Sequence, residues 1–416
     1  MEEWLSSAAR ARPDHPAVAA EGRTLTYAEL HERADALARR LAVAPGDRVP
    51  TTLPPGLAFC ELLHALPRRA AVLVPLDPRG AAVPEAPLGA PHQGALVEEV
   101  APAWVHSVVH TSGTTGEPRA VELTYANHAA SAAASADALG VEAGDRWLCP
   151  LPLHHVGGLN VLVRSAINRT TVVLHERFEA ERVKSVLEAG EVTLASMVPT
   201  MLARLRDAGL GRAPGLRAIA LGGGPIAPGL LAWAAEAGIP VVPVYGMTET
   251  CSQVVAGSPG RPLRGVELRL DGDGEILIRG EMVAREAAGA DGWLRTGDLG
   301  RLDDAGRLHV EGRKKELIVT GGEDVAPLEV ERALLSHPAV ADAGVAGLAD
   351  PEWGEAVTAF VVLRTPASAD ELLARCRERL DAFKVPKSLR VVRELPRNPN
   401  GKLLRDRLDH LESAPP

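Results

Sequence analysis

Between residues 150 and 256, short apolar runs alternate with stretches of helical periodicity. The apolar runs are 171–174, 192–197, 216–221 and 241–244, and the helical stretches are 179–189, 199–208 and 228–237. This alternation is typical of βαβ units, in which successive strands pair in parallel and the helices cover the sheet. The sequence therefore predicts an α/β fold with a largely parallel sheet in this part of the chain.

The segments on either side of this region have different residue patterns. Residues 4–43 show helical periodicity interrupted by two prolines, and residues 80–103 form a Pro/Gly/Ala-rich stretch that predicts a loop. After residue 260, short strand-like runs with tight turns predict a small β unit. We expect a large N-terminal domain over residues 1–312 and a small α+β domain over residues 313–416.

The bulk composition argues against several classes of function. The 416-residue chain has a net charge of −9, which favours neither nucleic acid nor an anionic membrane as a partner. Its apolar runs are shorter than the roughly 18 residues needed to span a bilayer, and its N-terminus lacks the apolar stretch of a signal peptide. Its four cysteines form no CxxC metal or redox pair. A cytoplasmic protein with no nucleic-acid or membrane partner is expected.

A segment rich in glycine and hydroxyl groups, HTSGTTGEPR, occupies residues 110–119, after a strand-like run and before a predicted helix. Glycine lets the backbone wrap around an anion, the hydroxyl groups donate hydrogen bonds, and Arg119 supplies positive charge. The segment is not a Walker A loop, because GxxxxGK[ST] is absent. These features favour a phosphate-binding loop over the alternative, a hydroxyl-rich linker.

This segment resembles the phosphate loop of the adenylate-forming superfamily, which includes acyl- and aryl-CoA ligases, amino-acid adenylation domains and luciferases. Arg119 and Ala120 stand where the family pattern has Lys and Gly, and Arg119 keeps the positive charge in a chain with only six lysines. Further segments resemble family motifs in the family's order: PLHH at 152–155, LGGGP at 221–225, YGMTET at 245–250, WLRTGD at 293–298, GRKKELIVTGG at 312–322 and NPNGK at 398–402. Each motif alone reads as a turn or a solvated side chain, whereas their common order does not arise by chance.

The resemblance implies an ATP site with Mg²⁺. Expected nucleotide contacts are Thr111, Ser112, Gly113, Thr114, Thr115, Gly116, Arg119, Gly222, Gly223, Gly224, Pro225, Tyr245, Gly246, Met247, Thr248, Asp298 and Arg313. The expected catalytic residues are Lys402, Glu249 and His155, and Lys402 would bridge the substrate carboxylate and the α-phosphate. Glu249 and Thr115 are expected to hold the metal ion. Tyr245 would stack on adenine.

The resemblance also implies a cap domain that rotates between two half-reactions. Its pivot corresponds to Lys315, and the loop with Gly321 and Gly322 would then face the channel for the thiol of coenzyme A. An exposed polar pivot suits a large backbone change. Residues 313–316 also read simply as a charged turn. A further implication is that the large domain is shortened between about residues 80 and 105.

The acid substrate is expected to contact His155, Arg164 and Ser252, with Cys251 and Gln253 lining the same pocket. Residues 158–167 predict an apolar helix. An Arg buried on such a helix needs an anionic partner, whereas an Arg exposed at the helix end needs none, and the sequence leaves both open.

The runs GLNVLVR and YGMTETCSQ resemble the o-succinylbenzoate–CoA ligases of menaquinone biosynthesis, whose substrate has a second carboxylate. The resemblance therefore implies an ATP-dependent acid–CoA ligase that acts on a small-molecule carboxylic acid. Three alternatives stay open: another aryl or acyl acid, transfer to a carrier-protein thiol, and a non-catalytic nucleotide-binding relative. The sequence does not fix the oligomeric state, so a homodimer stays open.

Overall fold

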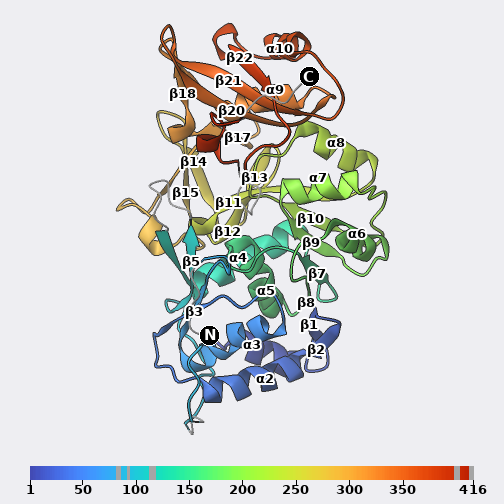
Figure 1. Ribbon diagram of the computed structural model, residues 1–416. Helices are drawn as coiled ribbons and strands as arrows, with labels where there is room; N and C mark the ends of the chain where they lie inside the picture. The colour runs from blue at the N-terminus through green and yellow to red at the C-terminus, as the bar shows by residue number, and fades with distance from the viewer. Residues whose placement is uncertain (81–85, 91–93, 112–118, 398–402, 412–416) are drawn as a thin grey trace.

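The computed structural model describes residues 1–80, 86–90, 94–111, 119–397 and 403–411. A 13-stranded sheet runs through the larger part of the molecule (Figure 1). In spatial order its strands are β14 (Glu267–Leu270), β15 (Glu275–Arg279), β16 (Leu294–Leu302), β17 (Leu308–Arg313), β13 (Gly260–Pro262), β12 (Ser252–Gly257), β11 (Val241–Met247), β10 (Ala218–Leu221), β9 (Leu194–Met197), β7 (Arg146–Cys149), β8 (Thr171–Leu174), β1 (Pro16–Ala20) and β2 (Arg23–Thr26).

The sheet has a parallel part and an antiparallel part. Every pairing from β11 through β10, β9, β7 and β8 to β1 is parallel. Every pairing from β11 through β12 to β14 is antiparallel. The helices of the parallel part are α5 (Val156–Asn168), α6 (Ala180–Glu188), α7 (Pro199–Asp207) and α8 (Pro228–Glu236). The predicted βαβ alternation is therefore confirmed.

The N-terminal region adds a four-stranded sheet and a group of helices. The sheet has the order β3 (Arg48–Thr51), β4 (Val72–Pro75), β5 (Val105–Thr111) and β6 (Arg119–Thr124). The helices are α1 (Trp4–Ala11), α2 (Tyr27–Arg40), α3 (Leu57–Ala65), the 3-10 turn η1 (Pro67–Arg69) and α4 (Tyr125–Leu139). The prediction of helical structure over residues 4–43, interrupted at two prolines, is wrong after the second proline, because β1 and β2 form an antiparallel pair between α1 and α2.

Local sequence explains where several of these helices begin. Thr26 and Thr124 each accept a hydrogen bond from a backbone N–H three residues on, which caps α2 and α4. Pro199 and Pro228 open α7 and α8, where a residue without an N–H loses no helical hydrogen bond.

The C-terminal domain is a small α+β unit, drawn in orange and red at the top of Figure 1. Its elements are β18 (Ile318–Thr320), β19 (Glu323–Val325), α9 (Pro327–Leu335), β20 (Val340–Asp350), β21 (Gly354–Leu363), α10 (Ala369–Arg377), η5 (Ala382–Lys384), β22 (Ser388–Val391) and η6 (Arg405–Arg407). Its hydrophobic core, which begins at Ile318, is separate from the main core of the large domain, which extends to Leu308. The boundary expected from the sequence, at 312–313, stays a prediction.

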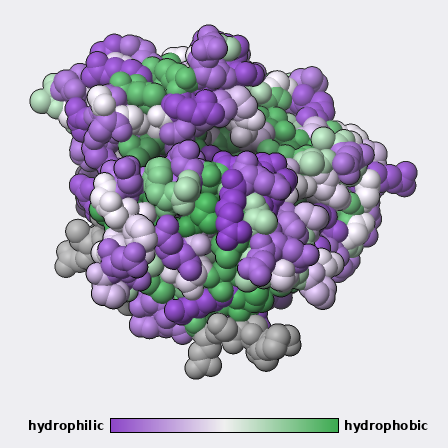
Figure 2. Space-filling model, turned by 90° about the horizontal axis from the view of Figure 1, so that it is seen from above, coloured by the Kyte–Doolittle hydropathy of each residue, from purple (hydrophilic) through white to green (hydrophobic). Residues whose placement is uncertain are grey.

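The face on the side of this C-terminal domain is mostly hydrophilic, with hydrophobic residues between (Figure 2). Within the described ranges, every helix is too short or too polar to cross a lipid bilayer.

Candidate functional site

Three residues that the sequence assigned to the nucleotide come together across the large sheet. The Tyr245 hydroxyl, at the end of β11, donates a 2.8 Å hydrogen bond to Oδ2 of Asp298 in β16. Nε of Arg313 in β17 lies 2.9 Å from Oδ1 of the same carboxylate, and the two residues are register partners. Burial raises the pKa of Asp298, and the Arg313 charge and the Tyr245 hydroxyl oppose that rise. This cluster can accept the paired hydroxyls of a ribose beside an aromatic ring.

The motif that follows Tyr245 forms a tight turn between two antiparallel strands. Gly246 pairs with Gln253, and a Cβ at Gly246 would lie 1.9 Å from the Ser252 carbonyl oxygen, so only glycine fits. Met247 ends β11, and Thr248 and Glu249 lie in the 3-10 turn η2 (Thr248–Thr250). Glu249 is half-buried, and its carbonyl oxygen accepts a 2.8 Å hydrogen bond from the backbone of Ala284.

The loop with three glycines, residues 222–225, lies next to this turn. Gly222, Gly223, Gly224 and Pro225 directly follow β10, and β10 pairs in parallel with β11. A Cβ at Gly222 would lie 2.8 Å from the carbonyl oxygen of Val244, one residue before Tyr245. The backbones of the two predicted nucleotide motifs therefore approach closely.

The ends of the predicted phosphate loop lie opposite each other. Thr111 ends β5, Arg119 begins β6, and the two residues are register partners. The Thr111 hydroxyl donates to the Arg119 carbonyl oxygen at 3.4 Å, and the Arg119 side chain is exposed. Ser112, Gly113, Thr114, Thr115 and Gly116 lie outside the described residues. The helix predicted after this loop is present as α4, but strand β6, which was not predicted, comes between the loop and Tyr125.

Two histidines precede α5 on the predicted acid side. The rings of His154 and His155 lie 4.1 Å apart, and Nε2 of His154 is 3.9 Å from a carboxylate oxygen of Asp77, which follows β4. Burial lowers the pKa of His155 to about 4. His155 is therefore uncharged near neutral pH.

Arg164 lies inside the large domain on α5, with 3% of its surface exposed. This decides between the two readings that the sequence left open, because the side chain is not at an exposed helix end. Its Nη2 donates a 2.8 Å hydrogen bond to the Ser131 hydroxyl of α4, whereas its Nε is buried without a partner in the described structure. Burial lowers the pKa of Arg164 to about 10, so the group stays a cation near neutral pH. A buried cation without a carboxylate partner is suited to bind an anionic ligand.

The residues beside Glu249 differ in their surroundings. Ser252 is half-buried. Cys251 and Gln253 are buried against α4, where Gln253 donates a 3.0 Å hydrogen bond to the Ser135 hydroxyl. Sequence reasoning missed Ser131 and Asn160, two buried polar residues that contact Cys251. For Asn160, its placement among the apolar residues of α5 was a sequence feature that could have indicated it.

The predicted hinge begins directly after β17. Lys315 is exposed in the 3-10 turn η4 (Lys314–Glu316), and Gly321 and Gly322 are exposed between β18 and β19 with positive φ. Lys402 lies outside the described residues.

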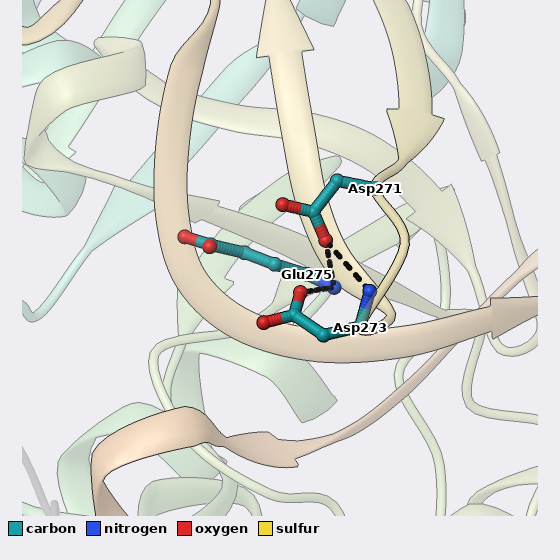
Figure 3. A group of neighbouring side chains, drawn as sticks. All are labelled: Asp271, Asp273 and Glu275. Atoms are coloured by element: carbon teal, nitrogen blue, oxygen red, sulfur yellow. Dashed lines mark hydrogen bonds between the residues drawn. The ribbon is translucent and has the colours of Figure 1, made fainter.

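Three carboxylates, Asp271, Asp273 and Glu275, gather at the turn between β14 and β15 (Figure 3). Lys314 forms an ion pair with Asp273, and Arg295 lies 2.8 Å from Asp271. An oxygen of Glu275 accepts a 2.9 Å hydrogen bond from the backbone of Gly297, next to Asp298. Lys314 and Arg295 offset the negative charge of this turn. Through Lys314 the turn contacts the start of the predicted hinge, and through Gly297 it contacts β16, the strand that contains Asp298.

The chain is similar to known proteins over most of its length. The model of the AMP-binding enzyme family matches residues 5–85 and 81–286, and that of the AMP-binding enzyme C-terminal domain matches residues 329–402. A 2-succinylbenzoate–CoA ligase of Bacillus subtilis (strain 168) is 45% identical over 331 residues, which cover 73% of this chain and 68% of the relative.

Solved structures of an o-succinylbenzoate CoA synthetase from Bacillus subtilis are also similar to this chain. The complex with the acyl-adenylate intermediate OSB-AMP has a TM-score of 0.91 at 36% identity and covers 100% of this chain and 99% of that one. The complex with ATP and magnesium ion has a TM-score of 0.87 at 36% identity, with 98% and 99% covered.

Proposed function

The chain belongs to the AMP-binding enzyme family, and we propose on that premise that it is an ATP-dependent 2-succinylbenzoate–CoA ligase of menaquinone biosynthesis. Within the structure, Arg164 is the observation that supports this substrate best. It is a buried cation next to the predicted acid site, with an unpartnered Nε and no ion pair to Asp or Glu in the described ranges. A dicarboxylate can react at one carboxylate while the other binds such a cation bidentately.

The reaction has two steps. A carboxylate oxygen of the acid attacks the α-phosphorus of ATP, the bond to the leaving pyrophosphate breaks, and an acyl-adenylate forms. The sulfur of CoA then attacks the acyl carbon, the bond to AMP breaks, and the thiol proton passes to solvent. Negative charge grows on the phosphate oxygens in the first step, so the protein acts mainly through placement and charge neutralisation.

We assign the nucleotide to the Tyr245–Asp298–Arg313 cluster and the loops beside it. Asp298 would exchange its present hydrogen bonds for the ribose hydroxyls, with Arg313 beside it. Lys402 would bridge the reacting carboxylate and the α-phosphate. His155, Arg164 and Ser252 would contact the acid, and Gly321 and Gly322 would contact the pantetheine of CoA.

Magnesium ion fits the donors proposed for it. Glu249 offers a half-buried carboxylate and Thr115 a hydroxyl group, and oxygen ligands of this kind suit Mg²⁺. The ion would neutralise charge on the phosphates of ATP. Glu249 lies in the η2 turn, which is held by the 2.7 Å hydrogen bond that the Thr250 hydroxyl donates to the Ser252 carbonyl oxygen.

Pyrophosphate release tests the proposal. The purified protein is supplied with ATP, Mg²⁺ and either 2-succinylbenzoate, benzoate or a fatty acid, with and without CoA. We expect release that depends on 2-succinylbenzoate, and CoA thioester formation when CoA is present. Activity with monocarboxylates alone would remove the substrate assignment, and no release with any acid would support a non-catalytic relative.

The location of the protein in the cell and its oligomeric state need separate experiments. We propose a cytoplasmic location, where ATP and CoA are available, which cell fractionation tests. Sedimentation velocity decides between a monomer and a homodimer.

A further inference from the structure

The turn that joins η2 to β12 has an unusual backbone. Cys251 and Ser252 have φ values of +50° and +89°, in the left-handed region that side chains other than glycine rarely adopt. Such a conformation persists only where the surrounding structure holds it. The turn directly follows Glu249 and contains Ser252, so its shape decides where the proposed metal ligand and the proposed acid contact lie.

Two buried side chains hold this turn through one carbonyl oxygen. The oxygen of Cys251 accepts a 2.7 Å hydrogen bond from the Ser131 hydroxyl of α4 and a second one, also 2.7 Å, from Nδ2 of Asn160 on α5. Ser131, Asn160 and Cys251 are each at most 1% exposed. Both lone pairs of this carbonyl are therefore used by side chains that come from elements far away in the sequence.

The same contacts reach the proposed acid-binding residue. Arg164 donates to the Ser131 hydroxyl, which in turn donates to Cys251, so the three groups form a chain of hydrogen bonds. Asn160 and Arg164 lie one helical turn apart, on the same side of α5. The Cys251 thiol also lies 3.4 Å from Nδ1 of His128. One buried network thus connects the cation for the second carboxylate with the turn that places Glu249.

We propose that Asn160, together with Ser131, is a positioning residue that holds the Cys251–Ser252 turn in its left-handed conformation for adenylation. Neither residue is assigned a contact with substrate, and both act through the Cys251 carbonyl. This inference rests on the proposed function, because the turn matters through Glu249 and Ser252. It assigns to Asn160 a role in the rate of the first step rather than in the affinity for the acid.

The test compares Asn160→Leu with a matched variant of the same helix. Leucine has the same branched shape and number of side-chain heavy atoms as asparagine, and it cannot donate to the Cys251 carbonyl. We expect kcat for pyrophosphate release to fall about 10- to 100-fold, with KM for 2-succinylbenzoate changed less than about 3-fold. Ser165→Ala is the control, because Ser165 is also buried on α5 but its hydroxyl has no partner in the described structure. Its kcat should stay within about 2-fold of the wild-type value.

A second substitution separates positioning from general destabilisation. Glycine adopts positive φ without strain, so Cys251→Gly combined with Asn160→Leu should recover at least about 5-fold of the lost kcat. Denaturant unfolding of each variant distinguishes the two causes, because a loss caused only by a weakened fold would follow the free energy of unfolding rather than the shape of the turn. Ser131→Ala removes the other hydrogen bond and also the acceptor of Arg164, so it should lower kcat in the same way and change KM as well. Its kcat tests the proposal if Asn160→Leu does not fold.

The wild-type enzyme in the same assay keeps the two claims apart. No release by the wild type with any acid would remove the proposed function. Normal release by the wild type, with equal kcat in Asn160→Leu and Ser165→Ala, would overturn only the positioning role. Failure of Cys251→Gly to recover activity in the double variant would overturn it as well.

Discussion

Arg164 keeps a positive charge inside the large domain, and replacing it tests the choice of substrate. Arg164→Met has a similar volume and no charge. It should raise KM for 2-succinylbenzoate about 10- to 100-fold, because a charge-assisted hydrogen bond contributes roughly 1.5–3 kcal/mol. Steady-state pyrophosphate release at varied acid concentration measures this.

Two further variants make the result specific to the second carboxylate. Arg164→Lys keeps the positive charge but lacks the planar guanidinium group that binds a carboxylate with two hydrogen bonds. Its KM for 2-succinylbenzoate should lie between those of the wild type and Arg164→Met. Arg261 is exposed on β13, so Arg261→Met should leave the KM for 2-succinylbenzoate at the wild-type value. Equal loss of activity toward 2-succinylbenzoate and toward a slow monocarboxylate substrate would show that Arg164 supports the fold rather than the acid.

The sequence predicts residues that stand in motifs better than it predicts contacts between residues far apart in the chain. Tyr245, Asp298 and Arg313 could be predicted to share a site, because each stands in a recognisable motif, and the structure brings them into contact. Ser131 and Asn160 could not, because they meet Cys251 across 120 and 91 residues of chain. Nothing local to a Ser or Asn on an apolar helix indicates which carbonyl it will bind.

At the scale of whole elements, strands with strong local patterns were predicted well, and strands that depend on distant partners were not. Strand β8, with the sequence TVVL, matches its predicted range of 171–174. Strand β1, with the sequence PAVAA, has weak strand propensity and forms because it pairs with β8, some 150 residues away. In β6, buried Val121 and Leu123 alternate with more exposed residues, so its period-2 pattern was present in the sequence but overlooked.

The hinge element allows a prediction about the second step alone. Lys315 lies in the short turn η4, where the backbone must change if the cap rotates. Proline fixes φ near −65°, within the range typical of a 3-10 turn such as η4, and opposes rotation. Lys315→Pro should therefore keep acyl-adenylate formation within about 3-fold and slow thioester formation by about 100-fold or more. Single-turnover measurements of each half-reaction would show the difference.

The control for the hinge is Lys315→Ala, which removes the same side chain and leaves the backbone free. Both half-reactions should then continue at close to the wild-type rates. If Lys315→Pro forms thioester at the rate of Lys315→Ala, rotation about this residue does not occur during the reaction.

For the molecule as a whole, buried histidines predict a loss of stability in mild acid. Burial lowers the pKa of His128 to about 3 and those of His155 and His175 to about 4, against 6.5 for the free side chain. Between pH 6.5 and pH 4 the unfolded chain binds protons that the folded chain does not. The free energy of unfolding should therefore decrease as the pH falls through this window.

Denaturant unfolding at pH 7, 6 and 5 measures this slope. His175→Gln should make the slope shallower, whereas His410→Gln should not, because His410 is exposed near the chain end. Identical slopes in the wild type and His175→Gln would contradict the assignment to buried His175.

The segments on either side of Lys402 contact the rest of the C-terminal domain. Lys402 itself lies outside the described residues, but its flanks are anchored in the cap. Arg397 forms a backbone bridge with Leu403, and Arg405 pairs with Glu331 of α9 and, at 2.8 Å, with Glu316 beside the hinge. We therefore expect Lys402 to move with the cap, and we propose that its ammonium group can reach the α-phosphate in only one orientation of the cap.

Lys402→Ala should consequently affect one step only. Pyrophosphate release should fall about 1000-fold, because a positioned cation stabilises the charge that grows on the phosphate oxygens. Thioester formation from synthetic acyl-adenylate and CoA should stay within about 5-fold of the wild-type rate. Lys184→Ala is the control, since Lys184 pairs with Glu188 on α6 of the large domain, and it should keep both steps. Equal loss of both steps in Lys402→Ala would mean that the amine serves a single fixed site, and the cap would then have no reason to rotate.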